Sequence, residues 1–156
     1  MGISENYFKN LLQERNALEA VSILSSFWSS RALDSEKNFN LSGPEYNVQL
    51  VLIYSGEVGN GGHSQCFFSR GVVYLNDTVV ALQKLGLSPA DKLILKASTI
   101  ITPYLGSDED FSEYDAEALS KLDLELCDII HKFDPLILSY INANNSSFLA
   151  PERGLV

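Results

Sequence analysis

The stretch that decides the fold reads Glu57-Val58-Gly59-Asn60-Gly61-Gly62-His63-Ser64-Gln65-Cys66-Phe67-Phe68-Ser69-Arg70-Gly71 and directly follows the most apolar run of the chain. Glycine accepts positive φ angles and close backbone approach at little steric cost, so Gly59, Gly61 and Gly62 predict a sharp corner. Asn60 and Gln65 are amides with apolar neighbours. Because a buried amide needs hydrogen-bond partners, we expect both amides to bind backbone groups near the corner.

The segment before the corner is predicted to be a buried helix. Ser42-Gly43-Pro44-Glu45 combines the spacing of a capping box with an early proline, which is typical of a helix start. Residues 46–58 are apolar almost all round, as expected of a helix in the middle of a bundle. A buried strand over 48–54 is the alternative, but the strong start signal and the apolar residues up to Val58 favour a helix.

Apolar residues at three- and four-residue spacing predict further helices on both sides of the corner. We expect one long or two short helices over 4–30, then helices at 64–69, 78–85 and 88–102, a longer one after residue 107, and a last one to about Ile141. Phe67 and Phe68 should enter the core, Asn76 or Asp77 should cap the helix that Gly86 ends, and the stripe of the longer helix is Leu119, Leu122, Leu126, Ile129, Ile130 and Phe133. The predicted fold class is all-α: a single-domain helical bundle of about six to eight helices over 1–141, with the glycine-rich corner in its middle, and a C-terminal tail at 142–156.

The corner also carries a resemblance to a known family. The order Glu57-x-x-Asn60-Gly61-Gly62-x-x-Gln65-x-Phe67-Phe68-x-x-Gly71, followed by Ala81-Leu82-x-x-Leu85-Gly86-Leu87, resembles a family of small acidic bacterial proteins with a domain of unknown function. The best-studied member of that family is a DNA mimic. The resemblance covers roughly residues 44–101 and departs from the pattern at His63 and Cys66, where larger aromatic residues are usual. It implies an all-helical, dimeric fold that presents carboxylates to a protein partner.

Acidic residues are concentrated in one part of the chain. The net charge is −9, from twenty acids and eleven bases. Nine acids and a single base, Lys121, lie between Ser107 and Asp128, which gives this segment a net charge of −8; the acids are Asp108, Glu109, Asp110, Glu113, Asp115, Glu117, Asp123, Glu125 and Asp128. The rest of the chain is close to neutral. Direct binding to nucleic acid is not expected, because it needs a clustered basic face.

The acidic segment admits two interpretations. Ser107 and Ser112 each resemble a helix start, where carboxylates are favoured by the helix dipole. If residues 107–128 formed one helix, it would span about 33 Å, and the linear density of its carboxylates would be comparable to that of one DNA strand. The alternative is an ordinary solvated helix face, with capping acids and with pairs between Glu117, Lys121 and Glu125.

Other chemistries find little support in the sequence. Cys66 and Cys127 both have apolar neighbours, as expected of small buried thiols in a reduced cytoplasmic protein. A thiolate at Cys66 with His63 as its base is the least favoured hypothesis, since we expect Cys66 to be buried. Neither a zinc ligand set nor a phosphate-binding loop is found, so no metal or cofactor is predicted. No export signal or membrane span is expected either.

The sequence therefore predicts a non-enzymatic, acidic interaction protein. It would use the carboxylates of 108–128 to occupy the nucleic-acid-binding face of a basic partner, such as a transcription regulator, a nucleoid protein or a nuclease. The alternative is an immunity or antitoxin-like protein that neutralises a basic toxin. The corner residues Glu57, Asn60, Gly61, Gly62, Gln65, Phe67, Phe68 and Gly71 are assigned to the scaffold.

Overall fold

The computed structural model describes residue 10 and residues 19–23 and 43–148, so most of the helix or helices predicted over 4–30 lies outside the described residues. Between 43 and 148 every regular element is helical, which confirms the all-α prediction. The elements are α3 (Gly43–Arg70), α4 (Leu75–Lys84), α5 (Ala90–Ile101), the short 3-10 helix η1 (Thr102–Tyr104), α6 (Glu113–Ile129), a second 3-10 helix η2 (Ile130–Lys132), α7 (Phe133–Ala143) and α8 (Asn145–Phe148).

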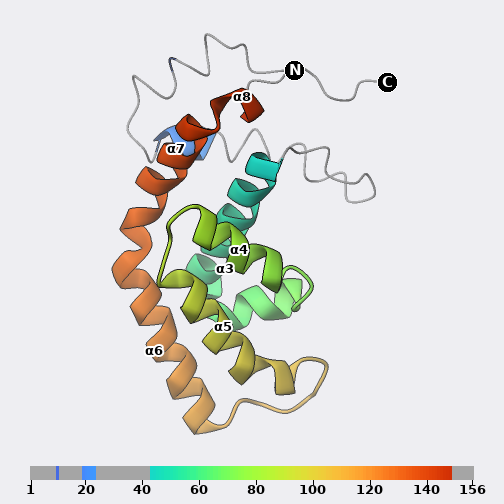
Figure 1. Cartoon of the computed structure of the whole chain (residues 1–156). Helices are drawn as coiled ribbons and strands as arrows, with labels where there is room; N and C mark the ends of the chain where they lie inside the picture. Colours follow the sequence, from blue (N-terminus) through green and yellow to red (C-terminus); the bar gives the residue numbers. More distant parts are fainter. Residues whose placement is uncertain (1–9, 11–18, 24–42, 149–156) are drawn as a thin grey trace.

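Helix α3 is the central element of the bundle. It contacts α4, α5, α6 and α8 (Figure 1). Val48 and Val51 have no exposed surface, and Tyr54 is almost fully buried. The apolar run therefore forms a buried helix, and the strand alternative is wrong. Gly61 and Gly62 have non-helical backbone angles and divide α3 into two halves, as the glycine-rich corner predicted.

Helices α4 and α5 form an antiparallel pair beside α3 (Figure 1). Gly86 follows α4 with a φ of 73°, a conformation that favours glycine. The predicted start of α4 is wrong by about one turn: the helix begins at Leu75, and the N-cap residue before it, Tyr74, makes no side-chain capping hydrogen bond. Asp77 instead accepts a hydrogen bond from the Tyr46 hydroxyl at 2.9 Å, which joins α4 to α3.

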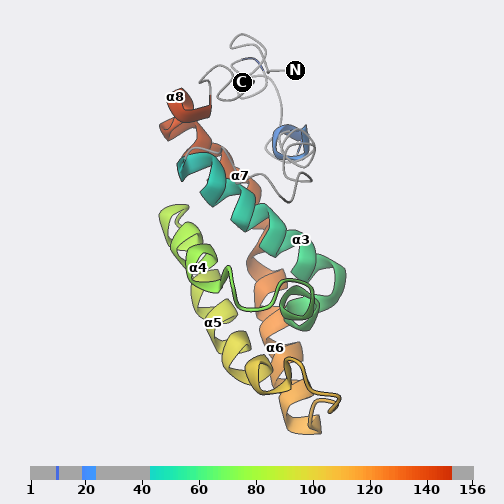
Figure 2. The ribbon, with the colours of Figure 1, turned by 90° about the vertical axis from the view of Figure 1, so that its right-hand side faces the viewer.

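Helices α6 and α7 follow one another along one edge of the molecule (Figures 1 and 2). The buried face of α6 consists of Leu119, Leu122 and Leu126, as predicted. Phe133 at the start of α7 is also buried, whereas Ile130 in η2 is 38% exposed, so its core assignment is wrong. The short 3-10 turn changes the direction of the side chains between the two helices, and the apolar stripe of α6 does not continue through it.

The C-terminal end of the bundle reaches beyond the predicted boundary at residue 142. Helix α7 continues to Ala143, and α8 brings Phe148 against the core. Only residues 149–156 of the predicted tail lie outside the described residues. Within the described part of the chain, no helix has the length and apolar character needed to cross a membrane.

Candidate protein-interaction site

The two amides of the corner do not have their predicted role. Asn60 and Gln65 are both exposed, and the Gln65 amide donates a hydrogen bond to the Ser69 hydroxyl at 2.7 Å rather than to the backbone. The helical turns on either side of the two non-helical glycines place both side chains toward solvent, where water satisfies an amide at no cost. Phe67 is buried as predicted, but Phe68 is 55% exposed, so its core assignment is wrong.

His63 is the buried polar group of the corner. Its side chain has no exposed surface, and each ring nitrogen has a partner. Nε2 lies 2.8 Å from the Tyr54 hydroxyl in the first half of α3. Nδ1 lies 2.5 Å from Oδ1 of Asp123 in α6, and the same oxygen accepts the His63 backbone N–H at 2.9 Å. One residue thus joins both halves of α3 to the middle of α6.

Burial determines the protonation state of this histidine. Removal from water lowers the pKa of His63 more than the hydrogen bond and the negative charge of Asp123 raise it. A neutral ring fits the contacts: Nδ1–H donates to the carboxylate, and Nε2 accepts the proton of the Tyr54 hydroxyl. Burial also raises the pKa of Tyr54, which keeps its hydroxyl a donor.

Gly62 is required by the same contact. Its φ is 74°, which side-chain-bearing residues rarely adopt. A Cβ atom at this position would also collide with the Asp123 carboxylate. The corner is therefore shaped by the approach of α6, and any side chain at position 62 would displace Asp123.

An ion pair closes the corner on its outer side. Arg70 at the end of α3 contacts Glu57 before the kink, with Nη2 at 3.1 Å and Nε at 3.2 Å from Oε1. Gly71 follows with a φ of 63° and ends the helix. Glu57, Gly62 and Gly71 shape the corner through this ion pair and through their backbone conformations, and Phe67 is buried beside it.

The nine predicted partner-binding acids fall into two groups. Three have partners inside the protein: Asp123 holds His63, Asp115 accepts the Tyr104 hydroxyl at 2.6 Å, and Glu117 pairs with Lys121 at 2.8 Å. The other six are exposed, and their carboxylates contact no partner among the described residues; they are Asp108, Glu109, Asp110, Glu113, Glu125 and Asp128. Only the second group is available in full to a partner protein.

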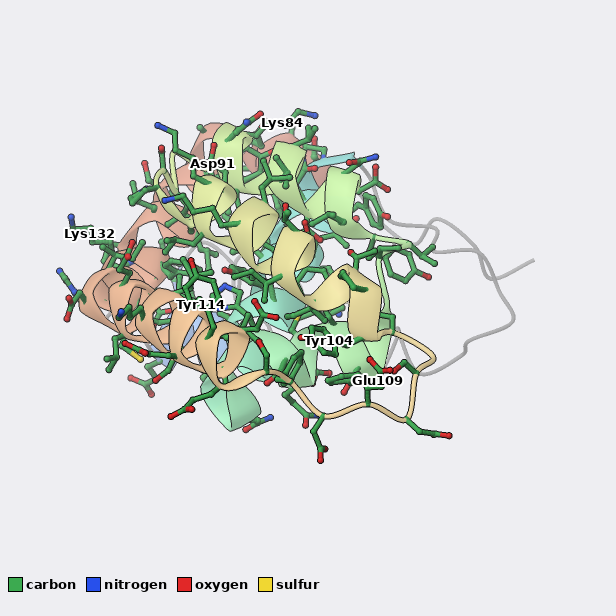
Figure 3. All side chains as sticks on the ribbon, turned by 90° about the horizontal axis from the view of Figure 1, so that it is seen from below. Lys84, Asp91, Tyr104, Glu109, Tyr114 and Lys132 are labelled. Atoms are coloured by element: carbon green, nitrogen blue, oxygen red, sulfur yellow. The ribbon has the colours of Figure 1, made fainter. Side chains whose placement is uncertain are left out.

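Four of the six available acids lie close together in the chain, at the start of α6. Residues 107–112 are not helical, so the predicted helix start at Ser107 and the single 33 Å helix are wrong. Gly106, with a φ of 77°, breaks the chain direction after η1. We call Asp108, Glu109, Asp110 and Glu113 the acidic loop; Figure 3 shows Glu109 on it, at the opposite end of α6 from Lys132.

The segment that carries the acidic loop is fixed at its C-terminal end. Ser112 caps α6 by accepting the Asp115 N–H at 3.1 Å, and the Tyr104 hydroxyl donates to the Asp115 carboxylate. The rings of Tyr104 and Phe111 lie 4.6 Å apart in an edge-to-face arrangement, and Phe111 also contacts the Phe68 ring. The exposed Phe68 therefore supports the acidic loop rather than the core.

The acids on α6, with or without an internal partner, do not form one continuous row. An α-helix turns about 100° per residue, so Glu113, Glu117 and Asp128 share a side, whereas Asp123 and Glu125 lie on opposite flanks. Lys121 and Leu124, which is 65% exposed, interrupt the acidic side. The charge is therefore most concentrated at the acidic loop and becomes sparser along α6.

The geometry does not support a Cys66 thiolate with His63 as its base. His63 uses both ring nitrogens for Tyr54 and Asp123 and has none left for Cys66. Burial raises the pKa of the Cys66 thiol to about 11, which opposes thiolate formation at neutral pH. Cys127 is exposed, so its predicted burial is wrong. The described residues contain no group of three or more potential ligands that could hold a metal ion.

A comparison with protein-family models found a match that covers most of the chain. A family model described as DMP19-like protein matches residues 39–144, which is more than half of the chain. The chain belongs to this family. The DMP19-like match extends from before α3 to the end of α7 and so includes both the corner and the acidic loop. Comparisons with curated proteins and with solved structures found no significant match.

The sequence pointed to part of this site and missed another part. Asp123 was assigned to the partner surface, although it lies at the edge of the buried stripe formed by Leu119, Leu122 and Leu126. An acid that borders such a stripe is partly shielded from water and needs a hydrogen-bond donor. The Gly62-His63 pair could supply one, and these two features together could have indicated the internal role of Asp123.

Proposed function

We propose that this DMP19-like protein is an acidic interaction module whose acidic loop, extended by Glu125 and Asp128, occupies the nucleic-acid-binding face of a basic protein partner. The observation that carries the proposal is the set of six exposed carboxylates between 108 and 128 that have no cationic partner among the described residues. Carboxylates that are not neutralised internally produce a field that attracts basic surfaces over the Debye length of about 8 Å at physiological salt.

The fixed geometry of the acidic segment supports a binding role. Tyr104, Phe111 and Ser112 hold the C-terminal end of the loop through hydrogen bonds and ring contacts. A preformed loop loses less conformational entropy on binding than a flexible one does. The short N-terminal turn at Gly106 and the cap at Ser112 therefore favour a surface that meets its partner without refolding.

The charge pattern supports a particular partner class. Three consecutive acids followed by Glu113 suit a cluster of lysine and arginine side chains, which is how nucleic-acid-binding faces are built. Charge complementarity of this kind increases association rates and makes them sensitive to salt. A transcription regulator, nucleoid protein or nuclease has such a face, and occupation of that face would exclude nucleic acid.

A capture experiment tests the proposal. The protein is immobilised and incubated with lysate of its source cell at about 50 mM and about 500 mM salt, beside a variant with Asp108→Asn, Glu109→Gln, Asp110→Asn and Glu113→Gln. A partner should bind the wild type at low salt, leave at high salt, and bind the variant much more weakly.

A matched control separates local charge from total charge. A second variant neutralises Glu5, Glu14, Asp34 and Glu36, which changes the net charge by the same amount at positions far from the acidic loop in the sequence. The proposal expects this variant to capture the partner as the wild type does. Equal loss in both variants would show a nonspecific charge effect, and equal capture by all three proteins would remove the acidic loop from the interaction.

A further inference from the structure

A cavity of about 80 Å³ lies between the two halves of α3, α4 and α5, away from the acidic loop. Its position follows from the corner, because the kink at Gly61 and Gly62 turns the second half of α3 across the first. The wall is mostly apolar and aromatic, with Leu50, Ile53, Phe67 and Ile94 among its residues. The cavity belongs neither to the acidic loop nor to the hydrogen bonds of His63.

Two polar side chains in the wall have no hydrogen-bond partner among the described residues. They are the amide of Gln49 in α3 and the hydroxyl of Thr78 in α4, and each residue is only 6% exposed. The polar atoms of both side chains keep some accessible surface, since Oδ1 of Asp91 is the only fully buried side-chain oxygen or nitrogen without a partner in the described part of the chain; they can therefore bond to a molecule that enters the cavity. The cavity thus presents an unused amide and an unused hydroxyl from two different helices.

The wall carries no uncompensated charge. Its one ionic residue is Arg70, and the guanidinium of Arg70 is paired with Glu57 at 3.1 Å. A charged ligand would lose its hydration without finding an unpaired counter-ion, whereas an uncharged ligand avoids that cost. The chemistry of the wall therefore selects for a neutral molecule with an apolar body and one group that both donates and accepts hydrogen bonds.

We propose that this cavity is a binding site for a small uncharged carboxamide, with its apolar part among Leu50, Phe67 and Ile94 and its amide bonded to Gln49 and Thr78. The size fits a molecule of about four non-hydrogen atoms, such as acetamide: an apolar cavity of about 150 Å³ holds the six carbon atoms of benzene, and this one, of about 80 Å³, is about half as large. The site is independent of the proposed function, since none of its wall residues belongs to the acidic loop.

The test is a titration of the ¹⁵N-labelled full chain with acetamide, followed by NMR. Acetamide should cause saturable shifts at the Gln49 side-chain amide and at the backbone N–H groups of Cys66 and Thr78, with none at the acidic loop. Acetate, which has nearly the same shape but carries a charge, should bind at least about tenfold more weakly.

Three variants locate the hydrogen bonds. Thr78→Val keeps the shape and removes the hydroxyl, and Gln49→Leu removes the amide; each should weaken acetamide binding about three- to tenfold. Thr99→Val is the matched control, because the Thr99 hydroxyl is exposed and bonds the Leu95 carbonyl at 3.1 Å, outside the cavity. Absence of saturable shifts, equal binding of acetate, or unchanged affinity in both Thr78→Val and Gln49→Leu would overturn the proposal.

Discussion

Asp123 accepts two hydrogen bonds from His63 at a single carboxylate oxygen, from the backbone N–H at 2.9 Å and from ring Nδ1 at 2.5 Å. The two residues are sixty positions apart in the chain, and the contact fixes the kink of α3 against the middle of α6. The glycine-rich corner and the acidic helix are therefore one structural unit. An acid from the most negative segment of the chain has an internal role.

Removal of the Asp123 carboxylate should destabilise the protein strongly. Asp123→Ala leaves a backbone N–H and a ring N–H of the buried His63 without their acceptor, which should cost about 2 to 4 kcal/mol of unfolding free energy. Urea denaturation measures the effect. Asp128→Ala on the same helix is the control, since that acid is exposed, and its unfolding free energy should change by less than about 0.5 kcal/mol. Similar losses in the two variants would contradict the assigned role of Asp123.

A pair of glycine variants tests the approach of α6 to the corner. Gly62→Ala should lower the unfolding free energy by more than about 1 kcal/mol, because a side chain there meets both a φ of 74° and the Asp123 carboxylate. Gly59→Ala has open space around its Cβ position and lies in the helix. It should be neutral or stabilising by up to about 1 kcal/mol. The ordering of the two midpoints in thermal denaturation checks the prediction.

Stability should fall as the pH drops below the ordinary pKa of histidine. The pKa of His63 is lowered in the folded protein, mainly by burial, so below about pH 6.5 the unfolded chain binds a proton that the folded protein does not. Above that pH, the buried neutral ring of His63 costs the folded protein no stability. Below it, the unfolding free energy decreases by up to about 1.4 kcal/mol per pH unit.

Denaturation between pH 5 and 8 measures this dependence. His63→Phe should lack the part of the slope that comes from this ring, although the variant loses the two ring hydrogen bonds at every pH. His131→Gln, which changes an exposed residue and leaves the His63 contacts intact, is the control variant. If His63→Phe and the wild type lost stability in parallel over this range, the protonation account would be wrong.

The two thiols should react at very different rates. Cys127 is exposed, whereas Cys66 is 8% exposed and burial raises its pKa to about 11. Because the thiolate is the reactive form, iodoacetamide at pH 8 should modify Cys127 at least about tenfold faster than Cys66. Peptide mass spectrometry after timed quenching gives both rates. Comparable rates in the native protein, with the expected equality in denaturant, would mean that Cys66 is accessible.

Local patterns predicted the helices well where one residue type imposes a backbone conformation. The glycine pair gave the kink of α3, Gly86 gave the end of α4, and Ser112 gave the start of α6. Ser107 is followed by acidic residues, as a helix-capping serine often is, but no helix begins there. The apolar stripe that stabilises α6 begins only at Leu119, and the first turns before Ser112 would have had no buried face.

The site was harder to predict because its contacts join distant parts of the chain. Asp123 and Asp128 have the same residue type and lie on the same helix, and only the position of His63 gives the first of them an internal role. The sequence pattern also does not show that Gln49 and Thr78 line one cavity, because the cavity forms only where α4 packs on α3. Periodicity predicts which face of a helix is buried, but it does not predict which polar group of another helix will bond to that face.

The most direct test of the proposed function is competition with DNA. A partner captured at about 50 mM salt is challenged on the column with increasing duplex DNA, in parallel with uncharged dextran of similar mass. If the acidic loop occupies the nucleic-acid-binding face, duplex DNA should release the partner in proportion to its concentration and dextran should not. A ternary complex, in which the partner binds DNA while it remains on the immobilised protein, would contradict the account.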